Sequence, residues 1–103
     1  MNLSEKDQYI INQYQEDEEM MVLLYAQWCI NHDVDPHTLY EKAYPKQPKN
    51  KLLDEALTKT VDKEASEEIG TDLIIALLQA FGNDDLAFQL NQIAQKEDET
   101  KAE

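Results

Sequence analysis

The side chains most suited to chemistry lie close together in one short segment. It holds the only cysteine, Cys29, both histidines, His32 and His37, and the carboxylates of Asp33 and Asp35. Thiolate and imidazole are ligands that zinc prefers, and residues three apart on a helix share a face, as Cys29 and His32 would. A tetrahedral site needs further ligands, and the chain has no other cysteine or histidine. We therefore expect no bound metal ion. The candidate ligands for such an ion are Cys29, His32 and His37.

The same segment contains the residue types of a cysteine nucleophile, a histidine base and an orienting acid. Cys29, however, stands in an apolar stretch, where a cysteine usually packs as a small core residue. With Gly70 and Gly82 as the only glycines, the chain has neither a glycine-rich turn to display a nucleophile nor a phosphate-binding loop. We predict that the protein is not an enzyme and needs no cofactor.

A second group of residues suits binding rather than catalysis. Tyr40 and Tyr44 are one helical turn apart, and tyrosines often anchor protein interfaces. Lys42, Lys46 and Lys49 accompany them and could contact an acidic partner. The alternative is that the tyrosines pack on the core with their hydroxyls in solvent, while the lysines are simply hydrated. These five residues are the predicted interaction site.

Both groups depend on a short helix with clear start and stop signals. Asp35 is a good N-cap, and Pro36 suits the first helical position. The pair Tyr44-Pro45 ends this helix, because a residue before proline avoids the α region. The sequence thus predicts a helix from Pro36 to about Ala43.

Other apolar segments predict the remaining helices. Residues 20–31 and 71–81 are apolar on most sides, so they should lie at the centre. The first of these belongs either to one long helix over 4–31 or to a helix capped by Asp17 after a break near 15–17. Asn50 caps a helix that we expect to extend through Val61. Gly82-Asn83 is a left-handed stop signal, and we expect Asp84 to cap the last helix.

Composition agrees with an all-α fold. The chain has 103 residues, of which 42% are hydrophobic and 30% charged, with 2 glycines and 3 prolines. Sheets need more turn residues than this. We predict one compact bundle of about five helices (four to six) over residues 1–95, without a sheet. Residues 96–103 should form an acidic, disordered tail. Because the two central segments are so apolar, the chain is either a monomer or a homodimer that completes its core by self-association.

The charge limits the possible partners. Nine lysines, no arginine and 22 acidic residues give a net charge of −13. Residues 1–41 and 64–103 are acidic, whereas residues 42–63 carry six lysines and three acids. Nucleic acid and anionic membranes would be repelled. No apolar run approaches the roughly 20 residues of a membrane span, and no secretory signal is recognisable, so we expect a cytoplasmic protein.

These observations support three hypotheses about function. The first is a non-catalytic regulator, adaptor or inhibitor that binds another protein. The second is a nucleic-acid mimic, in which rows of carboxylates occupy the groove of a DNA- or RNA-binding protein. The third is a metal- or cysteine-dependent activity at residues 29–37.

Overall fold

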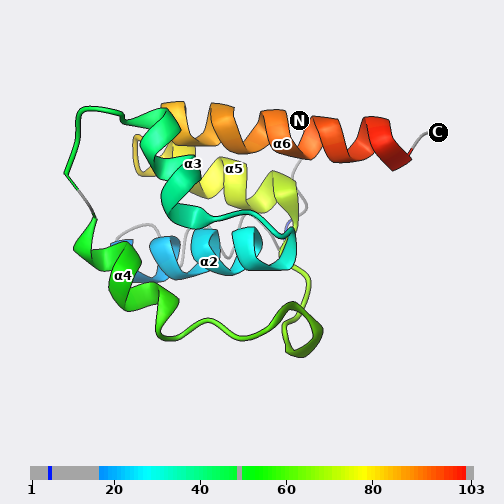
Figure 1. The fold of residues 1–103 in the computed structure, drawn as a ribbon, viewed down its shortest axis with the longest axis horizontal. Coiled ribbons are helices and arrows are strands. Elements are labelled where there is room, and N and C mark those ends of the chain that lie inside the picture. The colour runs from blue at the N-terminus through cyan, green and yellow to red at the C-terminus, as the bar shows by residue number, and fades with distance from the viewer. Residues whose placement is uncertain (1–4, 6–16, 49, 102–103) are drawn as a thin grey trace.

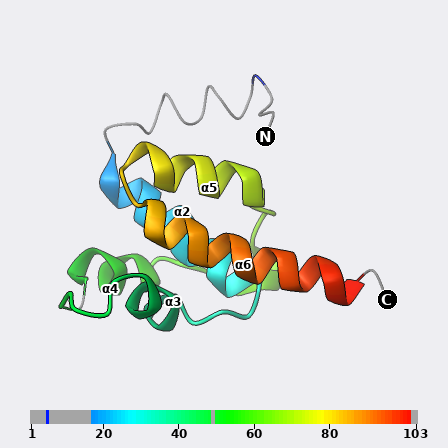
Figure 2. The same ribbon diagram turned by 90° about the horizontal axis from the view of Figure 1, so that it is seen from above.

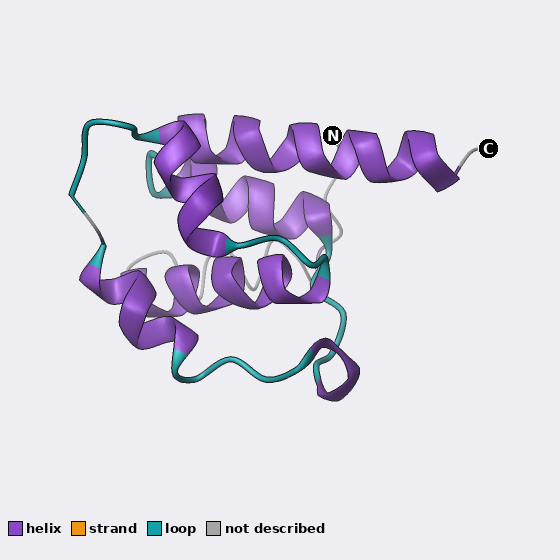
Figure 3. Ribbon diagram, viewed as in Figure 1, coloured by secondary structure: helices purple, strands orange, loops and turns teal. Residues whose placement is uncertain are grey.

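The computed structural model describes residues 5, 17–48 and 50–101. These residues form five α-helices and a short 3-10 helix, and they include no strand, which confirms the all-α prediction (Figures 1 and 3). The elements are α2 (Glu18–Asn31), α3 (Pro36–Ala43), α4 (Lys51–Leu57), η1 (Lys63–Ala65), α5 (Thr71–Ala80) and α6 (Asp84–Lys101). None of the helices in this part of the chain is long and apolar enough to cross a membrane.

Local capping signals set the start of several helices. The side chain of Asp17 accepts a hydrogen bond from the Met20 amide at 3.0 Å and is the N-cap of α2. This agrees with the prediction of a helix that begins after a break, while residues 6–16 lie outside the described part. Asn50 caps α4 in the same way, by accepting from Leu52 and Leu53. Each cap satisfies amide groups that the first helical turn leaves without a partner.

The predicted extension of α4 to Val61 is wrong. The helix ends at Leu57, and Val61 lies in the following loop with 46% of its surface exposed. A buried side chain of α2, Gln27, explains this end. Gln27 accepts from the Val61 amide and donates to the Val61 carbonyl, both at 2.9 Å. These two contacts hold the backbone of Val61 against α2. In a helix, the same amide and carbonyl groups would instead bond to residues one turn away.

The turn between α5 and α6 follows its glycine signal. Gly82 has a φ of +77°, the left-handed conformation that glycine adopts easily. The Asn83 amide then donates to the Leu78 carbonyl at 2.8 Å, which closes the end of α5. Asp84 is the first residue of α6 and not its cap, because the carbonyl of Asn83 accepts the first helical bond, from Ala87.

Helix α6 passes the boundary that we expected at residue 95. It continues to Lys101, and its last turns extend beyond the rest of the molecule (Figures 1 and 2). Residues 102–103 lie outside the described part. The predicted disorder of residues 96–103 in solution, and the domain boundary that goes with it, stay predictions.

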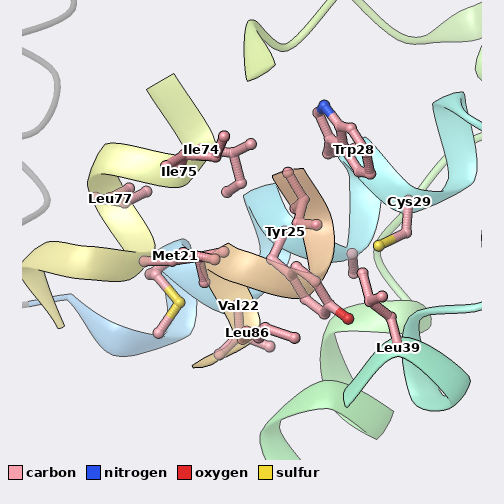
Figure 4. Packing of buried hydrophobic residues seen from close by; sticks show 14 of the residues in the cluster. Met21, Val22, Tyr25, Trp28, Cys29, Leu39, Ile74, Ile75, Leu77 and Leu86 are labelled. Atoms are coloured by element: carbon pink, nitrogen blue, oxygen red, sulfur yellow. The ribbon is translucent and has the colours of Figure 1, made fainter. Parts of the chain in front are cut away.

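The core forms where α2 meets the other helices. In Figure 4, apolar side chains of α2, α3, α5 and α6 point toward one another. Trp28 and Cys29 of α2, and Ile74 and Leu77 of α5, have no exposed surface. The predicted central position of residues 20–31 and 71–81 is therefore confirmed. Helices α5 and α6 form an antiparallel pair, and α4 packs on α2 (Figure 2).

Candidate interaction site

Of the predicted tyrosine pair, Tyr40 lies on α3 and Tyr44 is the residue that caps its end. The start of α3 is fixed as the sequence suggested. Asp35 accepts from the His37 amide at 2.9 Å, and Pro36 is in the first turn. Tyr40 and Tyr44 then fall on one face, with their rings edge to face at 5.1 Å. This geometry is favourable for two aromatic rings. The pair is thus a preformed aromatic feature of the short helix.

Both tyrosines border a cavity of about 310 Å³ that is open to solvent. This volume is at the lower end of the range of about 300–1,000 Å³ that is usual for ligand sites. Four chain segments build the walls: the first turns of α2, the end of α3 with its following loop, the start of α4, and the turn before α6. The lining residues are Glu18, Met21, Val22, Tyr25, Tyr40, Tyr44, Gln47, Asn50, Leu53, Gly82, Asn83 and Leu86.

Hydrogen bonds fix the tyrosine rings in the cavity wall. The hydroxyl of Tyr40 donates to Gln47 Oε1 at 3.0 Å, and that of Tyr44 donates to Asn83 Oδ1 at 3.2 Å. The two bonds tie α3 to its own loop and to the turn before α6. The rings are therefore positioned without being fully buried.

The electrostatic surroundings of the cavity are negative. Glu18 is the only charged residue among the described residues that line it. The pKa of Tyr44 is raised above its usual value, first by burial and further by the carboxylates of Asp85 and Asp84. Burial and the two carboxylates both disfavour an ionised phenol at this wall.

The predicted lysines are not part of the cavity wall. Lys42 and Lys46 are exposed, and neither is among the residues that line it. Lys49 lies outside the described residues. The structure therefore brings the two tyrosines together and leaves the described lysines on the outside of α3 and its loop. That these lysines contact a partner stays a prediction.

The cluster around Cys29 does not assemble into one site. Cys29 is fully buried, and burial raises the pKa of its thiol to about 12, an effect that the neighbouring Tyr25 hydroxyl partly opposes. The hydroxyl of Tyr25 itself donates to the Pro36 carbonyl at 2.8 Å. A protonated, enclosed thiol is a core residue, as the sequence had indicated, and a poor nucleophile.

The two histidines point to different partners. His32 stacks on Trp28 with ring centroids 4.0 Å apart, and its Nδ1 lies 2.7 Å from Glu97 Oε2. His37 Nε2 lies 2.9 Å from Asp54 Oδ1. In the described part of the chain, no three His, Cys, Asp or Glu side chains form a group suited to a metal ion. Each histidine therefore has a structural contact between elements.

Sequence reasoning missed most of the cavity wall. Glu18, Gln47 and Asn83 lie on three segments that are distant along the chain, and no periodicity connects them. The available signals were indirect: a glycine-asparagine turn and a proline-bounded loop, both of which often accompany binding sites.

Comparison with known proteins identifies the family of the chain. It matches the protein family described as YxiS over residues 2–95. It is 49% identical over 84 residues to the "Uncharacterized protein YxiS" of Bacillus subtilis (strain 168), across 77% of this chain and 83% of that protein. No solved structure shows a significant match. The name of that relative carries no substrate, ligand or partner.

Proposed function

The chain belongs to the YxiS family, and we propose that it is a non-catalytic protein-interaction module, a small acidic regulator, adaptor or inhibitor. The observation that carries this proposal is the open cavity beside Tyr40 and Tyr44. The two rings are half-buried and held in place, yet they border solvent. Rings in such a position are available to a second molecule.

Preorganisation supports this role. Ordering a flexible side chain at an interface costs roughly 0.5–1.5 kcal/mol. The hydrogen bonds from Tyr40 to Gln47 and from Tyr44 to Asn83 have already restricted both rings in the free protein. A partner that packs on these rings would therefore lose less free energy to side-chain ordering.

The state of the possible catalytic groups also favours a non-catalytic role. The raised pKa of Cys29 keeps its thiol protonated at neutral pH, and His32 and His37 are each engaged with a carboxylate. A reduced, buried cysteine and a net charge of −13 are in keeping with the cytoplasmic location that we propose.

A nucleic-acid mimic is the second candidate. The first turns of α2 and α6 both border the cavity, and both carry exposed carboxylates, those of Glu18 and Glu19 and those of Asp84 and Asp85. Two acidic patches at one end of the molecule could replace phosphates in a basic groove. Binding of this kind would weaken steeply with salt, and the partner would itself bind nucleic acid.

Affinity capture from a nuclease-treated lysate of the source cell tests the proposal. Wild-type protein, a Tyr40→Ala/Tyr44→Ala variant and a Gln79→Ala control are compared at low and high salt. Gln79 is a suitable control because it is exposed on α5 and does not line the cavity. Circular dichroism first establishes that each variant is folded.

We expect a partner that wild type and the Gln79 variant retain and the double variant loses. Retention at high salt would favour apolar contact with the tyrosines, and loss at high salt from a nucleic-acid-binding partner would favour mimicry. A partner that binds all three proteins equally, or no partner at either salt, would contradict the proposal.

Self-association is a separate proposal that concerns assembly. Phe88 is a large apolar side chain that the monomer leaves exposed, so α6 is the face on which a second copy could pack. Sedimentation equilibrium should then show a dimer for wild type and a monomer for Phe88→Ser. A wild-type protein that stays monomeric at high protein concentration would exclude self-association.

A further inference from the structure

The cavity beside Tyr40 and Tyr44 has the chemistry of a site for a positively charged side chain. Its wall combines aromatic rings, amide oxygens and a single carboxylate, that of Glu18, and no described lysine lines it. Aromatic faces attract ammonium and guanidinium groups, and carboxylates and amides accept their hydrogen bonds. We propose that this cavity receives a lysine or arginine side chain of the partner protein.

The local charges decide between a cation and an anion. Three helices, α2, α4 and α6, begin at this end of the molecule, and each helix start carries about half a positive charge. Against this stand the full negative charges of three exposed carboxylates, those of Glu18, Asp84 and Asp85. The carboxylates of Asp85 and Asp84 both raise the pKa of Tyr44, although burial raises it most and a hydrogen bond with the backbone of Leu86 lowers it.

The shape of the site agrees with one extended side chain. A volume of about 310 Å³ exceeds what a few ordered waters need, since each occupies about 30 Å³ in the liquid. It is too small for a helix or a strand of a partner. Tyr25, Val22 and Leu53 form its inner wall and can contact the methylene groups of a lysine or arginine stem.

Charge complementarity makes the partner a protein with an exposed basic residue. The chain itself has a net charge of −13, so long-range attraction would bring a basic surface toward it. This inference rests on the proposed function, because it assigns a chemical class to the contact that the interaction module makes. It adds that the contact is a single basic side chain between the tyrosines and Glu18.

Capped pentapeptides test the inference directly. Glycine peptides with arginine, lysine or citrulline at the centre are titrated into ¹⁵N-labelled full-length protein, and amide shifts are followed by NMR. Citrulline is close to arginine in size but neutral, because a carbonyl oxygen replaces one NH2 group of the guanidinium. We expect the arginine and lysine peptides to shift the amides of Gly82 and Asn83, and to bind at least about threefold more tightly than citrulline.

A pair of neighbouring substitutions supplies the matched control. Glu18→Gln and Glu19→Gln remove the same charge from the same exposed turn of α2, but Glu19 lines a different, smaller cavity. Glu18→Gln should weaken the arginine peptide by about two- to fivefold, the range of an exposed ion pair, and Glu19→Gln should weaken it less.

Three results would overturn the inference: equal binding of citrulline, equal effects of the two glutamate variants, or no shift with any peptide. If the captured partner is nevertheless lost in the Tyr40→Ala/Tyr44→Ala variant, the interaction module stands and only the basic side chain is refuted. If that variant keeps the partner, the proposed function fails as well.

Discussion

Replacing Gln27 by methionine should destabilise the protein more than the same replacement of an exposed glutamine. The buried amide of Gln27 makes two hydrogen bonds with the backbone of Val61 and a third with Asn31 Oδ1, each at 2.9 Å. Methionine has a similar volume and fills the same space, but its thioether can replace none of these bonds. The substitution therefore isolates the hydrogen bonds from the packing.

The expected magnitude follows from the burial of each group. A hydrogen bond contributes about 0.5–1.5 kcal/mol net, and an unsatisfied buried partner costs more. Because Val61 is 46% exposed, water can reach its backbone once the loop moves, so the lower values apply. Three bonds then give a loss of roughly 2 kcal/mol, which corresponds to a melting temperature about 8–16 °C lower for a domain of this size.

Urea unfolding followed by circular dichroism measures the effect, and hydrogen exchange of the Val61 amide locates it. Gln79→Met on α5 is the control, because Gln79 is exposed and its replacement should change the stability by less than about 0.5 kcal/mol. If Gln27→Met is as stable as Gln79→Met and the Val61 amide stays protected, Gln27 does not hold the loop. The explanation given above for the end of α4 would then be wrong too.

Three further changes test other parts of the structure. Cys29 should not react with a thiol reagent at pH 8 until urea unfolds the protein. The pKa of the Cys29 thiol is about 12 in the folded protein, above its usual value of about 9. The free energy of unfolding should therefore fall as the pH rises from about 9 to about 12, by up to about 1.4 kcal/mol per pH unit from this thiol. Cys29→Ala should remove that part of a pH series of urea midpoints, and a reactive thiol in the folded state would contradict its burial. Asp35→Ala should cost about 0.5–2 kcal/mol in urea unfolding, since it removes the cap of α3, and an unchanged midpoint would argue against that cap. Asp33 has a φ of +59°, so Asp33→Val should cost about 1–3 kcal/mol, whereas Asp33→Asn should melt near wild type, because asparagine tolerates this conformation. Equal melting temperatures for both variants would refute strain at this position.

What could be predicted from the sequence were features set by neighbouring residues. Asp17, Asp35 and Asn50 act on amides two or three residues away, and Gly82 acts through its own backbone. Each signal therefore survives in a short window of sequence. The all-α fold follows from such signals together with the apolar pattern.

What could not be predicted depends on contacts between distant residues. Gln27 and Val61 are separated by 34 residues, and Tyr44 and Asn83 by 39. A buried glutamine that satisfies a distant loop is indistinguishable in sequence from an exposed one. For the same reason the tyrosine pair could be proposed as a binding feature, while the cavity around it could not.

The extended end of α6 has a practical consequence for every binding experiment on this protein. Its last turns reach away from the body of the molecule, and the cavity lies at the opposite end, where α6 begins (Figure 1). A tag, dye or solid support attached after the final residue is thus carried on a helical spacer. Immobilised in this orientation, the protein presents its tyrosines to the solution instead of to the resin.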